Sequence, residues 1–289
     1  MITKNEISKI ATEKGVKTSI IDKDWVLGHF IDAIFSIQEC CKDLVFKGGT
    51  CLKKCCLPEY RFSEDLDFTS LNEHFVFDLT TLEKIVSLVT SRTELPLHIL
   101  SLDNLYFKDQ LTGYSALVKY WGAEHRKDQQ PPEPQRWLTK IKIEIILFEK
   151  MCFKAEKANV THPYSDKLTE NAEGIPVYSI NEMLAEKFRA LIQRSYSAPR
   201  DYYDIWYLSK NMENNNWDAV VEAFFIKTVY KNLDFSGIEQ LINSDNDKIL
   251  KSAWKNSLGH QIAKEKLPDY YLVKNDLLSL FTEVFMNQE

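Results

Sequence analysis

"FKGGTCLKKCCLPEYRFSEDLDFTS", residues 46–70, combines a Gly-Gly-Thr turn, a group of cysteines and two aspartates one residue apart. The apolar residues Leu44 to Phe46 predict a short strand that enters the turn, and the alternation in residues 64–70 predicts a second strand. That alternation places Asp65 and Asp67 on one face of the second strand. Two carboxylates side by side repel each other unless a cation lies between them. The stretch therefore predicts a site for a divalent cation such as Mg²⁺ or, as the simpler alternative, a solvated strand edge.

The Gly48-Gly49-Thr50 turn is a candidate nucleotide-binding element. Glycine lets the backbone approach a ligand closely, and the amide groups at the start of a helix favour an anion. Thr50 adds a hydroxyl at the start of a short helix that we expect over residues 50–56. A tight turn with an ordinary helix cap would explain the same residues without any ligand, so both interpretations stay open on this segment alone.

A third acidic residue, Glu144, lies within a predicted strand over residues 137–148. The apolar face of this strand consists of Ile141, Ile143, Ile145 and Leu147. Glu144 lies on the opposite face together with Lys142, and a carboxylate in the middle of a strand is uncommon without a partner. Glu144 can pair with Lys142, or it can complete a metal-binding triad with Asp65 and Asp67.

Charged residues also gather in the second half of the chain. Lys187 falls in one predicted helix, and Pro199 opens the next, which carries Arg200, Asp201 and Asp204. The last three share one side of their helix, because residues three and four apart are neighbours. They form either an ion pair within the helix or a functional group in which Lys187 binds phosphate and one aspartate orients Lys187 or an attacking hydroxyl.

The order of the patterns divides the 289-residue chain into two parts. Residues 4–40 and 78–91 read as helical, residues 95–148 read as strands, and residues 149–175 are expected to form a loop. From residue 179 to the end the pattern is helical. This layout predicts an α/β region of about 175 residues followed by an all-helical part.

The composition restricts the function classes. The formal net charge is -6, which argues against strong nonspecific binding of nucleic acid by the whole surface. Residues 136–157 nevertheless hold six Lys/Arg against three Glu, and residues 183–200 hold four against one. The apolar runs are too short to span a bilayer and the N-terminus lacks the pattern of a secretion signal, so we expect a cytoplasmic protein with no membrane contact.

The six cysteines do not follow a zinc-binding spacing, because two of the pairs are directly adjacent. We expect buried, inert thiols rather than a metal site or disulfides. The cysteines are Cys40, Cys41, Cys51, Cys55, Cys56 and Cys152.

The segments FKGGTCL, RFSEDLDF, EIILFE, AEKFRAL and RDYYDIWYL occur in an order that resembles the AbiEii/AbiGii toxin family of nucleotidyltransferases. The resemblance covers roughly residues 42–210, and its most specific pieces are the Gly-Gly-Thr to Ser-Glu-Asp-x-Asp pairing and the Arg-Asp-x-x-Asp helix. It implies an α+β nucleotidyltransferase fold with a mixed sheet and flanking helices over residues 1–175. An all-helical domain over residues 176–289 would contribute Lys187 and Asp204 to the cleft.

The resemblance also implies roles for individual residues. Gly48, Gly49 and Thr50 would hold the nucleotide phosphates, and Asp65 and Asp67 would bind the divalent metal. Ser63 would lie beside these aspartates, and Glu144 is acceptable as the third carboxylate. Lys187 matches the functional lysine of the family. Its functional aspartate falls in RDYYD, where we favour Asp204 over Asp201.

By this resemblance, the protein would move a nucleoside monophosphate from an NTP to a hydroxyl with the help of Mg²⁺ or Mn²⁺. A tRNA or another RNA is the expected acceptor, and the expected role is that of a toxin in a type IV toxin–antitoxin or abortive-infection system, with a separately encoded antitoxin. Two alternatives remain: transfer to a small-molecule or protein acceptor, and a nucleotide-binding module without turnover. The intact Asp65, Asp67 and Lys187 favour an enzyme over such a module.

Overall fold

A computed structural model describes residues 2–125, 129–194, 199–212, 216–242 and 247–286. The contacts divide the chain into two compact units. Met1–Glu149 and Ala155–Val177 form the first, which we call the sheet unit. Lys150–Lys154 and Tyr178–Glu289 form the second, which we call the helical unit.

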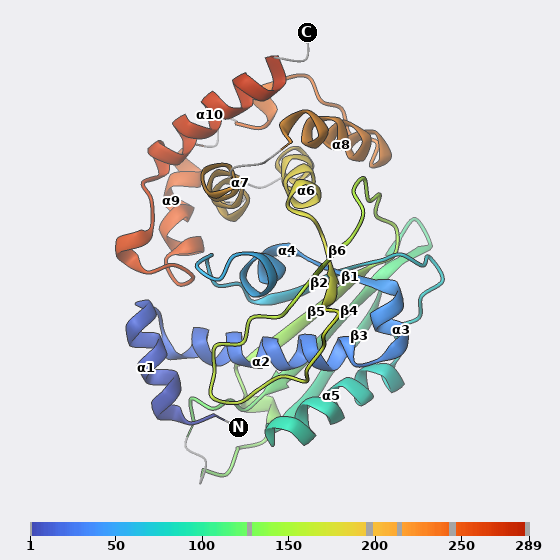
Figure 1. Cartoon of the computed structure of the whole chain (residues 1–289), viewed down its shortest axis with the longest axis vertical. Coiled ribbons are helices and arrows are strands. Elements are labelled where there is room, and N and C mark those ends of the chain that lie inside the picture. The colour runs from blue at the N-terminus through green and yellow to red at the C-terminus, as the bar shows by residue number, and fades with distance from the viewer. Residues whose placement is uncertain (1, 126–128, 195–198, 213–215, 243–246, 287–289) are drawn as a thin grey trace. The chain divides into compact units, whose positions relative to one another are not determined.

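The sheet unit is built on a seven-stranded mixed sheet with the order β3-β4-β5-β2-β1-β7-β6 (Figure 1). Its strands are β1 (Leu44–Lys47), β2 (Asp65–Ser70), β3 (Leu97–Phe107), β4 (Gln110–Tyr120), β5 (Lys140–Ile146), β6 (Glu156–Ala158) and β7 (Ile175–Val177). The neighbours β1 and β2 are antiparallel, whereas β2 runs parallel to β5 and β1 runs parallel to β7. The three central strands β5, β2 and β1 thus bring together segments that are far apart in the sequence.

One face of the central strands is the core of the sheet unit. Leu66 and Phe68 on β2 and Ile143 on β5 are almost fully buried on this face. The ring of Phe68 contacts that of Phe35 at a centroid distance of 5.9 Å, which places α2 (Thr18–Phe35) over the apolar face. The alternate residues, including Asp65, therefore point to the other side of the sheet.

Helices complete the sheet unit (Figure 1). α1 (Lys4–Lys14) packs on α2, α5 (Leu79–Thr93) packs on α2 and β3, and α3 (Gln38–Asp43) leads into β1. The Gly-Gly turn opens α4 (Gly48–Cys51), which continues as a π-helical turn, η1 (Leu52–Cys56). A short 3₁₀ turn, η2, spans Pro134–Arg136.

The helical unit packs around phenylalanine side chains. Phe188 on α6 is fully buried and contacts Phe224 on α8 and Phe281 on α10. Its helices are α6 (Ile180–Gln193), α7 (Pro199–Asn211), α8 (Trp217–Tyr230), α9 (Asp247–Leu258) and α10 (Tyr270–Met286), with 3₁₀ turns η3 (Ile238–Gln240) and η5 (Lys264–Lys266). Among the described residues, no helix combines the length and the apolar character that a membrane crossing requires.

The α+β architecture with a mixed sheet and a helical C-terminal region confirms the fold predicted from the sequence. The expected loop over residues 149–175 was wrong in part, because it contains β6 and its end forms the start of β7. Each of these strands has three residues, which is too short for alternation to be visible in the sequence. Residues 126–128, within the stretch 95–148 that reads as strands, lie outside the described residues.

Candidate functional site

The Gly-Gly turn lies against the second aspartate of the Asp-x-Asp pair. Gly48 has φ +79°, which a residue with a side chain rarely adopts, and a Cβ at this position would come within 2.5 Å of Asp67 Oδ2. A Cβ at Gly49 would meet Ser63 Oγ at 2.9 Å. Thr50 Oγ1 donates a hydrogen bond to the backbone oxygen of Asp65. The turn, Ser63 and both aspartates are therefore neighbours, and glycine is needed where the turn meets the carboxylate.

The register of the strands brings Glu144 to the same place. Asp67 is the Cα partner of Glu144 in the parallel pair β2–β5, and Asp65 is the partner of Lys142. Partners in adjacent strands project to the same face of a sheet. Glu144 and Lys142 form the ion pair that the sequence analysis offered as an alternative to metal binding.

Within this group, the surroundings of Asp67 disfavour the ionised form of its carboxyl. Its pKa is raised to about 6, because burial disfavours the charged form and because the carboxylates of Asp65 and Glu144 repel it. Lys47 acts in the opposite direction and lowers the pKa of Asp67. A carboxylate held among other carboxylates is a favourable position for a cation, since positive charge removes the repulsion.

Lys47 and Lys142 are further candidate residues of this site, which the sequence alone did not single out. Lys47 is the last residue of β1, is buried, and is the Cα partner of Asp67 in the antiparallel pair β1–β2. Its position directly before the Gly-Gly turn is the signal that could have revealed it. Both lysines place positive charge beside the carboxylates, so part of the repulsion is already balanced by the protein.

The candidate residues of the second half gather within the helical unit. Lys187 Nζ lies 2.7 Å from Asp201 Oδ1 and 2.6 Å from Asp204 Oδ2. Arg194 forms a second ion pair with Asp201. Asp204 is fully buried and Asp201 almost so, whereas Arg200 is exposed. The two aspartates on α7 thus hold a lysine of α6. Of the two alternatives drawn from the sequence, this contact agrees with an aspartate that orients Lys187 rather than with an ion pair confined to one helix.

The structure brings the candidate residues together in two groups, one in each unit. Gly48, Gly49, Thr50, Ser63, Asp65, Asp67 and Glu144 belong to the sheet unit, and Lys187, Asp201 and Asp204 belong to the helical unit. Among the described residues, the only group of three side chains whose ligand atoms lie close enough to share one metal ion is a different one, formed by His29, His162 and Asp166. Glu144 is bound to Lys142, so it would have to leave that partner to join a metal held by Asp65 and Asp67.

All six cysteines are reduced thiols, but only Cys40 and Cys51 are buried as expected, whereas the other four are half-buried. Cys40 and Cys51 are fully buried, and burial raises the pKa of the Cys40 thiol to about 12 and that of the Cys51 thiol well above its usual range. Thiols with a high pKa are poor nucleophiles and poor metal ligands because they stay protonated. Cys40 and Cys51 therefore contribute packing.

The protein has the α+β fold of a nucleotidyltransferase, as defined by the mixed sheet, the Gly-Gly turn and the strand that carries Asp65 and Asp67. The chain belongs to the family described as nucleotidyl transferase AbiEii toxin of type IV toxin–antitoxin systems, whose family model matches residues 29–274.

Solved structures agree with this fold at low sequence identity. MenT4, a nucleotidyltransferase toxin from Mycobacterium tuberculosis H37Rv, superposes with a TM-score of 0.65 and 16% identity, over 99% of this chain and 90% of that one. JHP933 from Helicobacter pylori gives a TM-score of 0.52 and 16% identity, over 94% of each chain. Among curated proteins, no sequence matches this chain.

Proposed function

We propose that this protein transfers a nucleoside monophosphate from an NTP to a hydroxyl of an RNA, with tRNA as the leading acceptor. The observation that carries the proposal is the Asp65–Asp67 pair beside the Gly48 turn, in a chain of the nucleotidyltransferase toxin family. Pyrophosphate is the other product. Modification of tRNA would stop translation, which accounts for a toxin that a separately encoded antitoxin must neutralise.

Asp65 and Asp67 would hold the divalent cation, Mg²⁺ or Mn²⁺. The donor set fits such an ion, because these carboxylates supply hard oxygen ligands. The raised pKa of Asp67 fits as well, since bound positive charge would relieve its burial among carboxylates. When bound, the ion supplies charge stabilisation at the α-phosphate and lowers the pKa of the attacking hydroxyl. Glu144 joins as a further ligand if it exchanges Lys142 for the ion.

The remaining residues of the sheet unit would orient the nucleotide. Backbone amides of Gly48 and Gly49 and the hydroxyls of Thr50 and Ser63 are suited to phosphate oxygens, because they are donors without a bulky side chain in the way. In this structure the hydroxyl of Thr50 donates to the backbone oxygen of Asp65, and this hydrogen bond holds the turn against β2.

Lys187, which belongs to the helical unit, would neutralise negative charge of the triphosphate. Its ammonium group is held by Asp201 and Asp204, which fix its position. Asp204 is the functional carboxylate that the family resemblance favours, and Asp201 pairs with Arg194 as well as with Lys187. Asp201 would then serve to position Lys187.

Two alternatives stand beside this proposal. The same residues could serve transfer to a small molecule or a protein, because they act on the nucleotide and not on the acceptor. The chain could also bind nucleotide without turnover. The basic segments 136–157 and 183–200 favour an RNA acceptor, since phosphate contacts dominate affinity for nucleic acid.

The test is a transfer assay with Mg²⁺, total RNA and each α-³²P-labelled NTP in turn. We expect label on a tRNA-sized band with the wild-type protein and none with Asp67→Asn. Asp103→Asn is the matched control, because Asp103 is an exposed aspartate on β3 of the same sheet. Absence of label on any RNA would point to a small-molecule or protein acceptor, and nucleotide binding without any acceptor would point to the non-catalytic module.

A further inference from the structure

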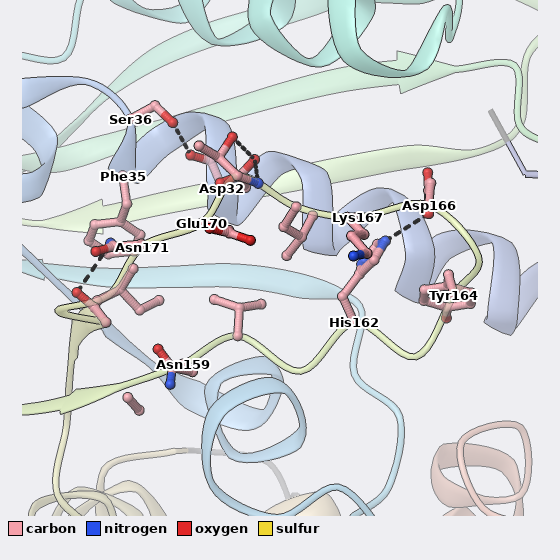
Figure 2. A pocket seen from close by; sticks show the side chains of 16 residues that line it. Asp32, Phe35, Ser36, Asn159, His162, Tyr164, Asp166, Lys167, Glu170 and Asn171 are labelled. Carbon is pink, nitrogen blue, oxygen red and sulfur yellow. Dashed lines mark hydrogen bonds and ion pairs between the residues drawn. The ribbon is translucent and has the colours of Figure 1, made fainter.

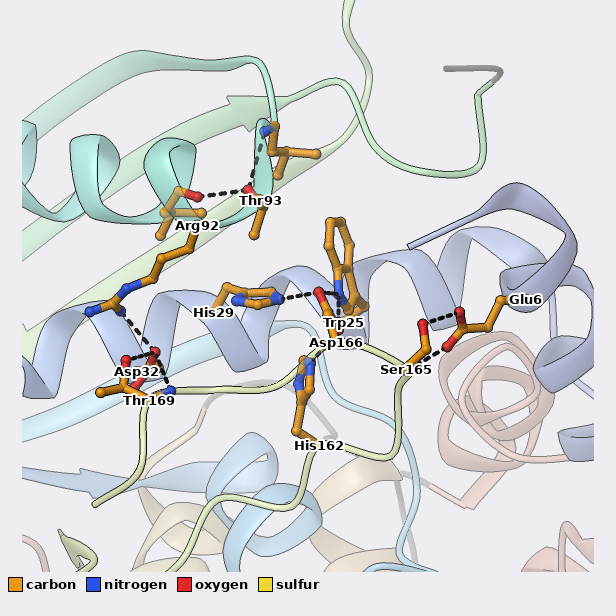
Figure 3. A network of polar contacts seen from close by, with 12 residues as sticks. Glu6, Trp25, His29, Asp32, Arg92, Thr93, His162, Ser165, Asp166 and Thr169 are labelled. Carbon is orange, nitrogen blue, oxygen red and sulfur yellow. Dashed lines mark hydrogen bonds and ion pairs between the residues drawn. The ribbon is translucent and has the colours of Figure 1, made fainter. Parts of the chain in front are cut away.

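Two histidines and an aspartate from distant parts of the sheet unit meet at one point (Figure 3). His29 Nε2 lies 3.0 Å from Asp166 Oδ2, and His162 Nε2 lies 2.9 Å from Asp166 Oδ1. His29 belongs to α2, whereas His162 and Asp166 lie in the segment 159–174 that joins β6 to β7. Trp25 Nε1, one turn before His29, also donates to the Asp166 carboxylate at 3.0 Å.

The positions of the donor atoms suit a single metal ion. One ligand atom from each of His29, His162 and Asp166 lies within 4.8 Å of the other two. Imidazole nitrogen and carboxylate oxygen are both common ligands of divalent metal ions.

The second nitrogen of each ring has no competing role. His29 Nδ1 and His162 Nδ1 are buried, and neither has a hydrogen-bond partner among the described residues. Without a metal, each ring donates its Nε2 proton to Asp166. When an ion binds at Nε2, that proton moves to Nδ1, where no hydrogen bond has to be broken. The new N–H group also lacks a protein acceptor, and the absence of such a hydrogen bond behind a metal ligand weakens metal sites by about 10–100-fold.

A cavity gives access to this group. It has a volume of about 710 Å³, and His162, Tyr164, Asp166, Lys167 and Thr169 are among its lining residues (Figure 2). A metal ion can therefore reach His162 and Asp166, and water can complete the coordination.

The segment 159–174 is fixed at a second point as well. Thr169 donates to Asp32 Oδ2 from its hydroxyl at 3.1 Å and from its amide at 3.2 Å, and Arg92 donates to the same oxygen at 2.8 Å. Asp32 lies on α2, one turn after His29. The three ligand residues are thus placed before any ion binds, which lowers the cost of binding.

We propose that His29 Nε2, His162 Nε2 and the Asp166 carboxylate bind a zinc ion, with water from the cavity as the fourth ligand. Two imidazole nitrogens and one carboxylate suit Zn²⁺, whereas Mg²⁺ prefers an all-oxygen set such as the one at Asp65 and Asp67. The ion would join α2 to the segment 159–174. This site is separate in its residues from the proposed nucleotidyl-transfer site, and the inference does not depend on that function.

The test uses the full chain without a histidine tag, freed of metal by a chelator and then titrated with Co²⁺. We expect visible d–d absorption at one Co²⁺ per chain, its loss when Zn²⁺ is added, and a rise in melting temperature with Zn²⁺. His162→Ala should lose all three effects. Asp67→Asn should keep them, and so should His98→Ala, which removes an exposed histidine on β3.

Absence of the absorption band in the wild-type protein would overturn the proposal and leave a hydrogen-bonded clamp of Trp25, His29 and His162 on Asp166. An equal band in His162→Ala would also overturn it. If circular dichroism shows that His162→Ala is unfolded, X-ray absorption of the zinc-loaded wild-type protein decides. Two imidazole ligands on zinc would support the site, and a shell of oxygen alone would refute it.

Discussion

Asp67 illustrates at the residue scale how a residue of the proposed site can oppose folding. Burial and the neighbouring carboxylates raise its pKa to about 6, so its ionised form is less stable in the folded protein than in the unfolded chain. Asp67→Asn should therefore raise the free energy of unfolding of the metal-free protein by about 1–3 kcal/mol at pH 8. The same variant should be inactive. Urea unfolding checks the first expectation, and an unchanged or lower stability would contradict the electrostatic account.

Asp22 on α2 is the basis of a second prediction at the residue scale. Its side chain is fully buried, and Oδ1 accepts from the amide of Ala123 at 2.8 Å. Burial, together with the charge of Glu124, raises the pKa of Asp22 to about 7 from an ordinary value of 3.8. Since the folded pKa is the higher one, the contribution of Asp22 to stability is fully present below pH 3.8 and is lost as the pH rises through about 7.

Asp22→Asn removes this titration. The free energy of unfolding of the variant relative to the wild type should rise by about 2–3 kcal/mol between pH 5 and pH 8. Comparing the two proteins cancels the titration of the other groups, including the histidines. Urea unfolding at both pH values gives the difference, and Asp103→Asn should show none. A constant difference for Asp22→Asn would mean that Asp22 is ionised throughout this range.

At the scale of the elements, a buried ion pair joins α6 to α8. Lys227 Nζ lies 2.5 Å from Glu182 Oε1, and both side chains are fully buried. Glu182 also accepts from the amides of Cys152 and Phe153, which ties the segment Lys150–Lys154 to the helical unit. Lys227→Met leaves a buried carboxylate without its counter-ion and should destabilise the protein by roughly 3–5 kcal/mol.

Thermal or urea unfolding of Lys227→Met measures this loss. Lys255→Met is the matched control, because Lys255 is exposed on α9, and its effect should stay within about 0.5 kcal/mol. Adding Glu182→Gln to Lys227→Met should recover part of the loss, since the uncompensated charge is gone. Equal transitions for Lys227→Met and Lys255→Met would show that the buried pair adds no stability.

The elements also show what the sequence could and could not reveal. The alternation in residues 64–70 and 137–148 was sufficient to find β2 and β5 and to place Asp65, Asp67 and Glu144 on a polar face. The register Asp67 to Glu144 and the pair Lys227 to Glu182 depend on contacts between distant segments, which periodicity does not encode. The same holds for His29 and Asp166, which are 137 residues apart.

At the scale of the whole molecule, the net charge of -6 bears on the choice of acceptor. A protein of this charge repels RNA on average, so an RNA acceptor has to be held by local basic residues. Arg136 and Lys140 are exposed members of the basic segment 136–157. Affinity that depends on such contacts falls steeply with salt, because each neutralised phosphate releases counter-ions.

We therefore expect the KM for the RNA acceptor to rise at least about tenfold between 50 and 200 mM KCl. Replacing Arg136 and Lys140 by Gln should reduce the slope of log KM against log salt by about 0.7–0.9 for each phosphate that the protein no longer neutralises. The KM for the NTP, measured in the same assays, controls for effects of salt on nucleotide binding and should change less. Transfer with a KM for the acceptor that is independent of salt would argue against RNA, because a small neutral acceptor makes no phosphate contacts and releases no counter-ions.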